Sequence, residues 1–392
     1  MNMFKRFDVT CEAVPLLAAV MQVRTFGEPG NPVIWTDALT LTPTAAGLEV
    51  ALGSDVDGRL ALVVPFVQTR GGLSAAPAVI AADRFSKARP RTITVSGGEL
   101  EEVLTSSAED PRRARVTIAE GHQHATVTLG AEVREITQCA LDLIVAPDRL
   151  PLVARLWRGD LAVALEHLRR AEAVAVEVRV GDGVVGLIGS GGGVVTTAQV
   201  EAFTPPSGQL SGFARLTLGQ LEAIVDGATG PQLEIGWDER GGGRWSVRGE
   251  GMAAELPAGT RSLWDGDLSL VSHLAEDAVG IDAAVLMDAV LRAVEGRDRL
   301  ADGSPAHVVL EQLRGCLGLL ADGAPVLDRR WLDATSRERG EERTVEAHAL
   351  VNALAPLQGK RVFLRFDVPG ALVLVEESLA QDPSAPRSVL PE

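Results

Sequence analysis

The chain of 392 residues has no tyrosine, and its six tryptophans and nine phenylalanines bring the aromatic content to only 4%. Proteins that stack bases or sugars need exposed aromatic rings, so the sequence argues against an aromatic binding platform. Cysteine is also scarce. Cys11, Cys139 and Cys316 are an odd number and lie far apart, without the spacing of a metal site or the density of a disulfide framework. We expect all three to be reduced.

Long apolar runs are missing as well. No stretch approaches the roughly 18 to 20 apolar residues that a membrane helix requires, and the first residues lack the apolar core of a signal peptide. We therefore expect a cytoplasmic protein with no membrane partner. Positive charge is in short supply, because 37 Lys and Arg face 53 Asp and Glu, which gives a net charge of -16. Such a field repels polyanions unless cations are concentrated locally.

What the sequence does contain is an internal repeat. A helical pattern, a strand, a turn and a second strand follow one another six times, starting near residues 10, 98, 160, 217, 281 and 346. The copy at 160 is the clearest: a helix over 160–171 precedes strands over 173–180 and 184–188, joined by Gly181-Asp182-Gly183. Glycine tolerates the positive φ that such a tight hairpin needs.

One helix with two strands cannot bury its own apolar faces, so two copies should pair in each domain. The sequence therefore predicts an α+β fold of three domains, each with helices packed on antiparallel sheets, arranged in an arc or half-ring. We place the domains at residues 1–136, 137–262 and 263–380, followed by a carboxyl-terminal tail at 381–392. The charged residues 328–343 are predicted to form a solvated loop.

This organisation resembles the bacterial sliding clamp, the beta subunit of DNA polymerase III. The similarity is most specific at Arg24 with NPVIWTDALTLTPTAAGLEVALGSDVD (31–57), and at VEAHALVNALAPLQGKRVFLRF (345–366). The resemblance implies a head-to-tail homodimer whose six domains close a ring around duplex DNA and tether a polymerase or repair enzyme. It implies a processivity factor in DNA replication, with no catalysis, cofactor or metal.

The resemblance also implies two sets of site residues. Arg24 occupies the position of the family's DNA-contacting arginine, and structural ion pairing is the alternative for it and for the arginines near Glu166. The candidate DNA-binding residues are Arg24, Arg169, Arg170, Arg292 and Lys360. The family captures short peptides of polymerases, clamp loaders and repair proteins in a cleft. The candidate cleft residues here are Gly191, Val194, Val389, Leu390 and Pro391.

The sequence departs from the family in charge and in the cleft. The six predicted helices carry four arginines against thirteen acidic residues, whereas phosphate binding depends on Lys and Arg. The segment over 188–195 also lacks the family's His and Arg. These departures support an alternative, a clamp-fold paralogue that acts as a protein-interaction scaffold without encircling DNA.

A third hypothesis is an enzyme with an unrecognised site. The sequence contains no Ser-His-Asp elbow and no catalytic frame of paired acids, which argues against it. The glycines at 189–193 could cradle phosphate, but no Lys-Ser or Lys-Thr follows them, so we favour a loop or bulge. His122 and His124 alternate on one strand face and could ligate zinc. Without a visible third ligand, we favour a solvent-facing pair.

Overall fold

The computed structural model divides the chain into two compact units, residues 1–158 with 219–258, and residues 159–218 with 259–392. No helix in the described part of the chain is both long and apolar enough to span a membrane. The structure describes residues 7–27, 37–44, 46–54, 58–66, 92–106, 115–121, 124–139, 150–181, 183–204, 212–239, 243–264, 271, 278–295, 305–322, 324, 329–335, 342–382 and 385–391.

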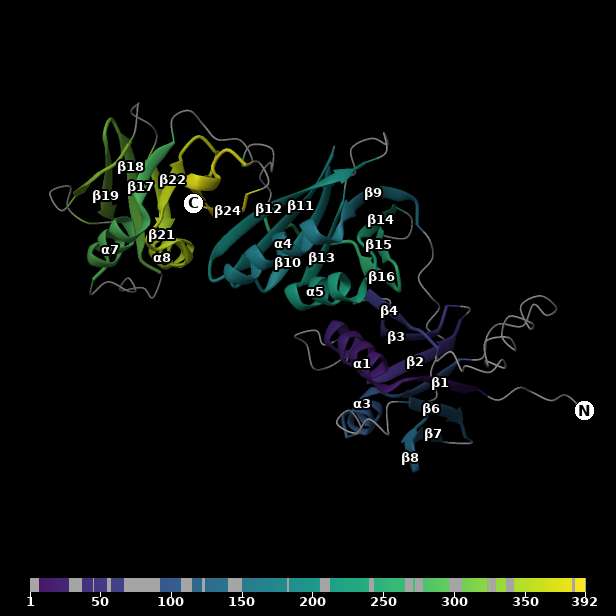
Figure 1. The fold of residues 1–392 in the computed structure, drawn as a ribbon. Helices are drawn as coiled ribbons and strands as arrows, with labels where there is room; N and C mark the ends of the chain where they lie inside the picture. The colour runs from purple at the N-terminus through teal and green to yellow at the C-terminus, as the bar shows by residue number, and fades with distance from the viewer. Residues whose placement is uncertain are drawn as a thin grey trace, which may run out of the picture. The chain divides into compact units, whose positions relative to one another are not determined.

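One order of elements, strand-helix-strand-strand-strand, occurs six times along the chain (Figure 1). The first three copies are β1 (Asp8–Glu12), α1 (Ala13–Gly27), β2 (Ala38–Pro43), β3 (Leu48–Ser54), β4 (Gly58–Val64); β5 (Ile93–Ser96), α3 (Gly97–Thr105), β6 (Arg115–Glu120), β7 (His124–Leu129), β8 (Glu132–Thr137); and β9 (Leu152–Trp157), α4 (Arg158–Arg170), β10 (Ala175–Gly181), β11 (Val184–Gly191), β12 (Val194–Phe203).

The last three copies follow the same order, with two short 3-10 helices added in the sixth. They are β13 (Phe213–Thr217), α5 (Leu218–Gly227), β14 (Gln232–Asp238), β15 (Arg244–Gly249), β16 (Met252–Pro257); β17 (Val279–Asp282), α7 (Ala283–Ala293), β18 (His307–Leu313), β19 (Cys316–Ala321), β20 (Arg330–Asp333); and β21 (Glu342–Glu346), α8 (Ala347–Leu354), η4 (Ala355–Leu357), β22 (Arg361–Arg365), β23 (Ala371–Glu376), η5 (Glu377–Leu379), β24 (Arg387–Pro391).

The structure therefore confirms the helix and the hairpin of the predicted repeat. The prediction was incomplete, because it missed one strand at each end of the repeat. Each copy has a strand before the helix and a further strand after the hairpin, which the sequence pattern did not reveal. The leading strands are four to six residues long and run directly into their helices, so their period-2 alternation is too brief to detect. The loop predicted at 328–343 was wrong in part, because β20 and the start of β21 lie within it.

Antiparallel sheets organise each compact unit. In the first unit, β1-β6-β7-β8 form one sheet and β9-β14-β15-β16-β4-β3-β2-β5 run side by side in another. The pair β16–β4, with Met252 opposite Leu62, joins strands from different copies of the repeat. The two compact units follow these sheets and not the predicted domain limits, which therefore stay a prediction.

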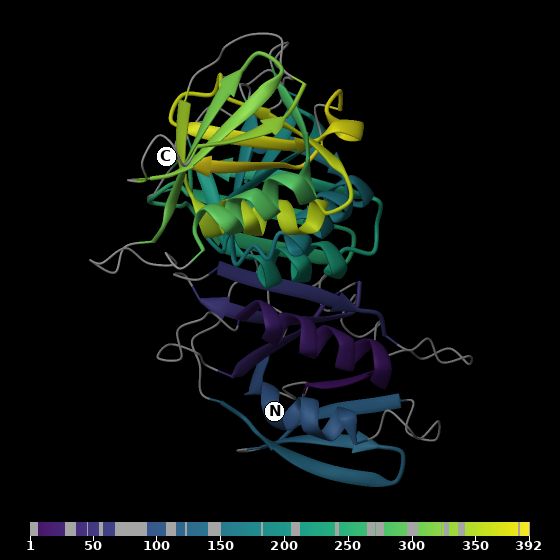
Figure 2. The same ribbon diagram turned by 90° about the vertical axis from the view of Figure 1, so that its left-hand side faces the viewer.

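The second unit has the same arrangement. Its sheets are β17-β22-β23-β24-β12-β11-β10-β13 and β20-β19-β18-β21, and β24 lies beside β12 with Val389 opposite Val195. Helices α7 and α8, green and yellow in Figure 2, pack against each other. The Asp282 carboxylate accepts hydrogen bonds from Ala284 N and Val285 N at 2.9 and 3.1 Å, which caps the first turn of α7.

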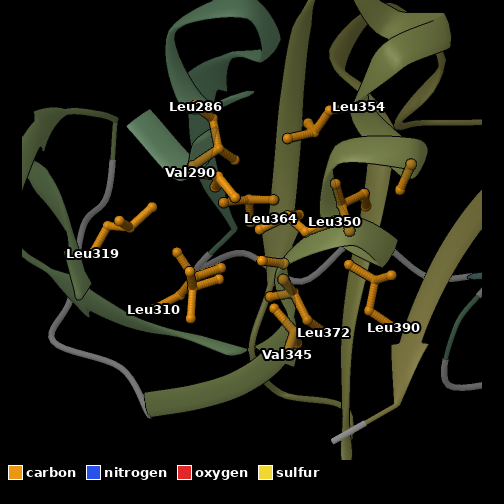
Figure 3. Packing of buried hydrophobic residues seen from close by; sticks show 14 of the residues in the cluster. Leu286, Val290, Leu310, Leu319, Val345, Leu350, Leu354, Leu364, Leu372 and Leu390 are labelled. Atoms are coloured by element: carbon orange, nitrogen blue, oxygen red, sulfur yellow. The ribbon is translucent and has the colours of Figure 1, made fainter. Parts of the chain in front are cut away.

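The core under α7 and α8 is aliphatic (Figure 3). Leu286 and Val290 of α7 meet Leu350 and Leu354 of α8 over Leu364, and all five side chains are 0% exposed. The two helices bury their apolar faces against strands of both repeat copies, which is the pairing that the sequence predicted for the third domain.

Replacing Leu350 with alanine should lower the free energy of unfolding by about 2–5 kcal/mol, because it leaves a cavity between α8 and the sheet. Chemical denaturation measures the loss. The matched control is Leu291→Ala on α7, where the side chain is 47% exposed and we expect a change within about 0.5 kcal/mol. Equal losses for the two variants would contradict this core.

Candidate functional site

Arg24 lies in the last turn of α1 and binds Asp37, which directly precedes β2, and Glu101 of α3. Its Nε donates to Asp37 Oδ1 at 3.0 Å, its Nη1 pairs with Glu101 of α3, and its side chain is 20% exposed. Asp37 Oδ2 also accepts from Ser96 Oγ at 3.1 Å and from the Gly98 amide. Two carboxylates thus compensate the guanidinium within its own unit.

The network explains why glycine follows Ser96. A β-carbon at Gly97 or at Gly98 would lie 2.9 Å from the Asp37 carboxylate, so a larger residue would displace the group that Arg24 binds. The structure therefore supports the alternative that Arg24 forms structural ion pairs, here with Asp37 and Glu101.

The other four candidate cations are also paired, on exposed surfaces. Arg170 Nε lies 3.1 Å from Glu166, which also binds Arg169; Arg292 lies 2.8 Å from Asp288; and Lys360 lies 2.6 Å from Glu376. Hydrogen bonds from Arg170 and Arg169 lower the pKa of Glu166, and those from Lys360 and Ser378 lower the pKa of Glu376. The cations are 49% to 65% exposed. Exposed pairs contribute little to stability, so these cations remain able to exchange a carboxylate for a phosphate.

The solvent-facing side of α1 is apolar instead of basic. Val14 is 61% exposed and Met21 is 49% exposed, and Ala18 is exposed between them. On α7, Val285 and Leu291 are 48% and 47% exposed. The acid-rich composition predicted for the helices is thus accompanied by exposed uncharged side chains, although α7 also presents the exposed Arg292, whereas phosphate binding depends on Lys and Arg.

The candidate cleft residues lie on paired strands but face different directions. Val194 and Leu390 belong to the core under α7 and α8, whereas their neighbours Val195 and Val389 belong to an apolar cluster on the opposite face of the sheet. Successive residues of a strand alternate between faces. Pro391, at the end of β24, is exposed.

Gly192 and Gly193, at the end of the glycine run, form the tight turn between β11 and β12, as the loop interpretation predicted, whereas Gly189 and Gly191 lie within β11; no helix follows the run. Gly192 and Gly193 have φ of +56° and +79°, which favours glycine. A β-carbon at Gly191 would lie 2.1 Å from Glu172 O. Asn352 Nδ2 of α8 donates to Gly192 O at 3.1 Å, so the turn is held between two elements of the second unit.

A buried ionic group near these strands was not predicted. Glu177 on β10 is fully buried and pairs with Arg179, and it also accepts hydrogen bonds from Ser262 and Leu263. The sequence feature that could have indicated this group is a glutamate and an arginine inside the apolar strand AVEVRV, since buried charges need partners.

His124 begins β7 and is exposed, and His122 lies outside the described residues. The described residues include no cluster of three or more potential metal ligands.

Arg24→Ala should lower the free energy of unfolding by about 1–3 kcal/mol, because Asp37 and Glu101 would face each other without their cation. Arg292→Ala, at an exposed i,i+4 pair, is the control and should change it by less than about 0.5 kcal/mol. Thermal and denaturant unfolding measure both. An Arg24→Ala protein as stable as the control would show that the network is not structural.

No family model and no curated protein matches the sequence. Solved structures do match the fold. The chain is similar to the DNA polymerase III beta subunit of Thermotoga maritima, with 11% identity, 98% of each chain covered and a TM-score of 0.64. It is equally similar to the beta subunit of Pseudomonas aeruginosa and to the DNA polymerase sliding clamp of Caulobacter crescentus, each with 14% identity, 98% of this chain and 99% of the other covered, and a TM-score of 0.64. The chain therefore has the sliding-clamp fold over nearly its whole length.

Proposed function

We propose that this protein is a sliding-clamp-like processivity factor that encircles duplex DNA and tethers a polymerase or repair enzyme, in the cytoplasm and without catalysing a reaction. The observation that carries the proposal is the sixfold strand-helix-strand-strand-strand repeat, together with 98% coverage of solved clamps. A tether of this kind raises the effective concentration of an enzyme on its template and needs no bond chemistry.

Two end strands of the sheets could support ring closure by a second copy. Among the described strands, β8 and β20 each have one hydrogen-bonded neighbour, β7 and β19 respectively, as do β1 and β21 at the other ends of the same two sheets. Val133 on β8 is 59% exposed and Trp331 on β20 is 56% exposed. An open edge presents unpaired N–H and C=O groups to another strand. A head-to-tail dimer would pair β8 of one copy with β20 of the other, and two such contacts close a ring.

Both edges carry charges of both signs. Arg134 and Glu135 are exposed on β8, and Arg330 and Asp333 are exposed on β20, so opposite charges can be paired across the contact. Arg329 lies 5.7 Å from the centre of the Trp331 ring, within the range of a cation–π contact. This contact helps to fix the orientation of the exposed indole ring at this edge.

The phosphate contacts would come from Arg169, Arg170, Arg292 and Lys360, through exchange of their exposed carboxylate partners. Arg24 is the weakest candidate, because Asp37 and Glu101 enclose it. Partner peptides from polymerases, clamp loaders or repair proteins would bind at the strands β12 and β24, around Gly191, Val194, Val389, Leu390 and Pro391.

A second candidate function is a protein-interaction scaffold that does not encircle DNA. The observation that favours it is the paired state of all five candidate cations, beside helices with apolar exposed faces. The two functions differ in whether DNA must be topologically closed to retain the protein.

We expect the protein, loaded on nicked circular DNA with ATP and an extract of its source cells to supply a loader, to stay bound during gel filtration in raised salt. Cutting the circle should release it, because a ring slides off a free end, whereas phosphate contacts alone weaken steeply with salt on either DNA form. Retention unaffected by linearisation, or no retention with an active loader, would reject encirclement and favour the scaffold.

Val133→Arg and Trp331→Arg should each convert the dimer to a monomer, because an arginine placed at the contact faces Arg330 or breaks the apolar match. Light scattering or sedimentation measures the mass. Val174→Arg is the control: Val174 is 71% exposed between α4 and β10 and lies on neither of the two edge strands. A monomeric starting protein, or two variants that remain dimers, would contradict the proposed closure.

A further inference from the structure

The sheet face opposite α7 and α8 carries an unexpected apolar cluster. Ile188, Val195, Val373 and Val389 are 0% to 6% exposed there. The second face of an antiparallel sheet commonly meets water and carries polar residues. These four side chains therefore need a cover that the sheet itself does not supply.

The cover comes from residues between β16 and β17. Val271 is 1% exposed within the cluster, and Leu263 and Trp264 pack against it while remaining half-buried. Neither Leu263 nor Trp264 lies in a helix or strand, so no backbone ladder holds them on the sheet. An aliphatic and an aromatic side chain, adjacent in sequence, occupy the surface.

The buried group on β10 holds this pair in place. Glu177 accepts from Leu263 N at 2.7 Å and from Ser262 Oγ at 3.1 Å. Arg179, paired with Glu177, donates to Ser262 Oγ at 2.6 Å and also to Trp264 O. A carboxylate that is 0% exposed is costly unless its hydrogen bonds are satisfied. The polar group is therefore satisfied when a backbone segment lies across it.

We propose that Leu263 and Trp264 are an internal occupant of the partner site, displaced when a partner peptide binds. This rests on the proposed function, which locates the partner site at β12 and β24. The partner is an extended peptide that presents a branched aliphatic residue beside an aromatic one, because that is the pair the cluster holds in the free protein. Its backbone N–H and C=O replace those of Leu263 and Trp264 at Glu177 and Arg179.

The occupant sets the affinity of the site. A partner binds only the open fraction of molecules, so its apparent dissociation constant is the intrinsic one divided by that open fraction. The geometry also assigns the contact residues: Val195 and Val389 lie on the docking face, while Val194 and Leu390 support it from the core.

The test uses the protein's own segment as the probe. A synthetic peptide, acetyl-Thr-Arg-Ser-Leu-Trp-Asp-amide, copies residues 260–265 and is titrated by calorimetry or anisotropy, without DNA. We expect the full-length variant Leu263→Ala/Trp264→Ala to bind it about tenfold more tightly than the unmodified protein, because the site is vacated. The control variant Trp157→Ala removes an exposed tryptophan of the other unit and should leave the affinity unchanged.

A second variant keeps the tryptophan. Ser262→Ala removes one hydrogen bond to Glu177 and should raise the affinity by a smaller factor, with cooperative unfolding retained. In the unmodified protein labelled with fluorotryptophan, the peptide should shift the Trp264 ¹⁹F signal, identified by its absence in Trp264→Phe. No gain in affinity over Trp157→Ala, or a bound peptide that leaves the Trp264 signal in place, would overturn the proposal. Because DNA is absent, these outcomes are separate from a failure of DNA retention.

Discussion

The structure depends on one constraint: a single helix with its strands has no partner for its apolar faces. Burial of Leu286, Val290, Leu350 and Leu354 between α7, α8 and their sheets removes several large side chains from water, and each such side chain contributes about 1.5–3 kcal/mol. Neighbouring copies of the repeat must therefore pack together. The pairs β16–β4 and β12–β24 extend this sharing into the sheets, because they join strands that belong to different copies.

The candidate cations fall into two groups: one that is enclosed by carboxylates and stabilises the fold, and four that are exposed and could bind another anion. Arg24 binds two partly buried carboxylates and links α1 to α3, so its loss would leave negative charges in proximity. Arg169, Arg170, Arg292 and Lys360 pair with carboxylates at exposed positions, where water already weakens the attraction. The same fold thus holds one arginine firmly and leaves four cations whose partners can change.

The buried Glu177 shows how a polar group can give an apolar surface a specific occupant. Apolar contacts alone are not directional, but the carboxylate and Arg179 accept and donate at fixed positions along Ser262, Leu263 and Trp264. The position of the segment is consequently set by hydrogen bonds, while the cluster of Ile188, Val195 and Val389 supplies the area. A surface built this way is suited to exchange one extended segment for another of matching chemistry.

Sequence by itself determined the sixfold repeat, the six helices and the central hairpin of each copy, because the periods of 3.6 and 2 residues and the glycine turns are local properties. It did not reveal the short leading strands or β20, whose alternation is too brief to read. Only the tertiary structure decided that Val194 and Val195 serve opposite faces, that Arg24 is enclosed by Asp37 and Glu101, and that Leu263 and Trp264 cover the sheet. These facts join residues far apart in the chain, and their contacts exist only after the sheets have formed.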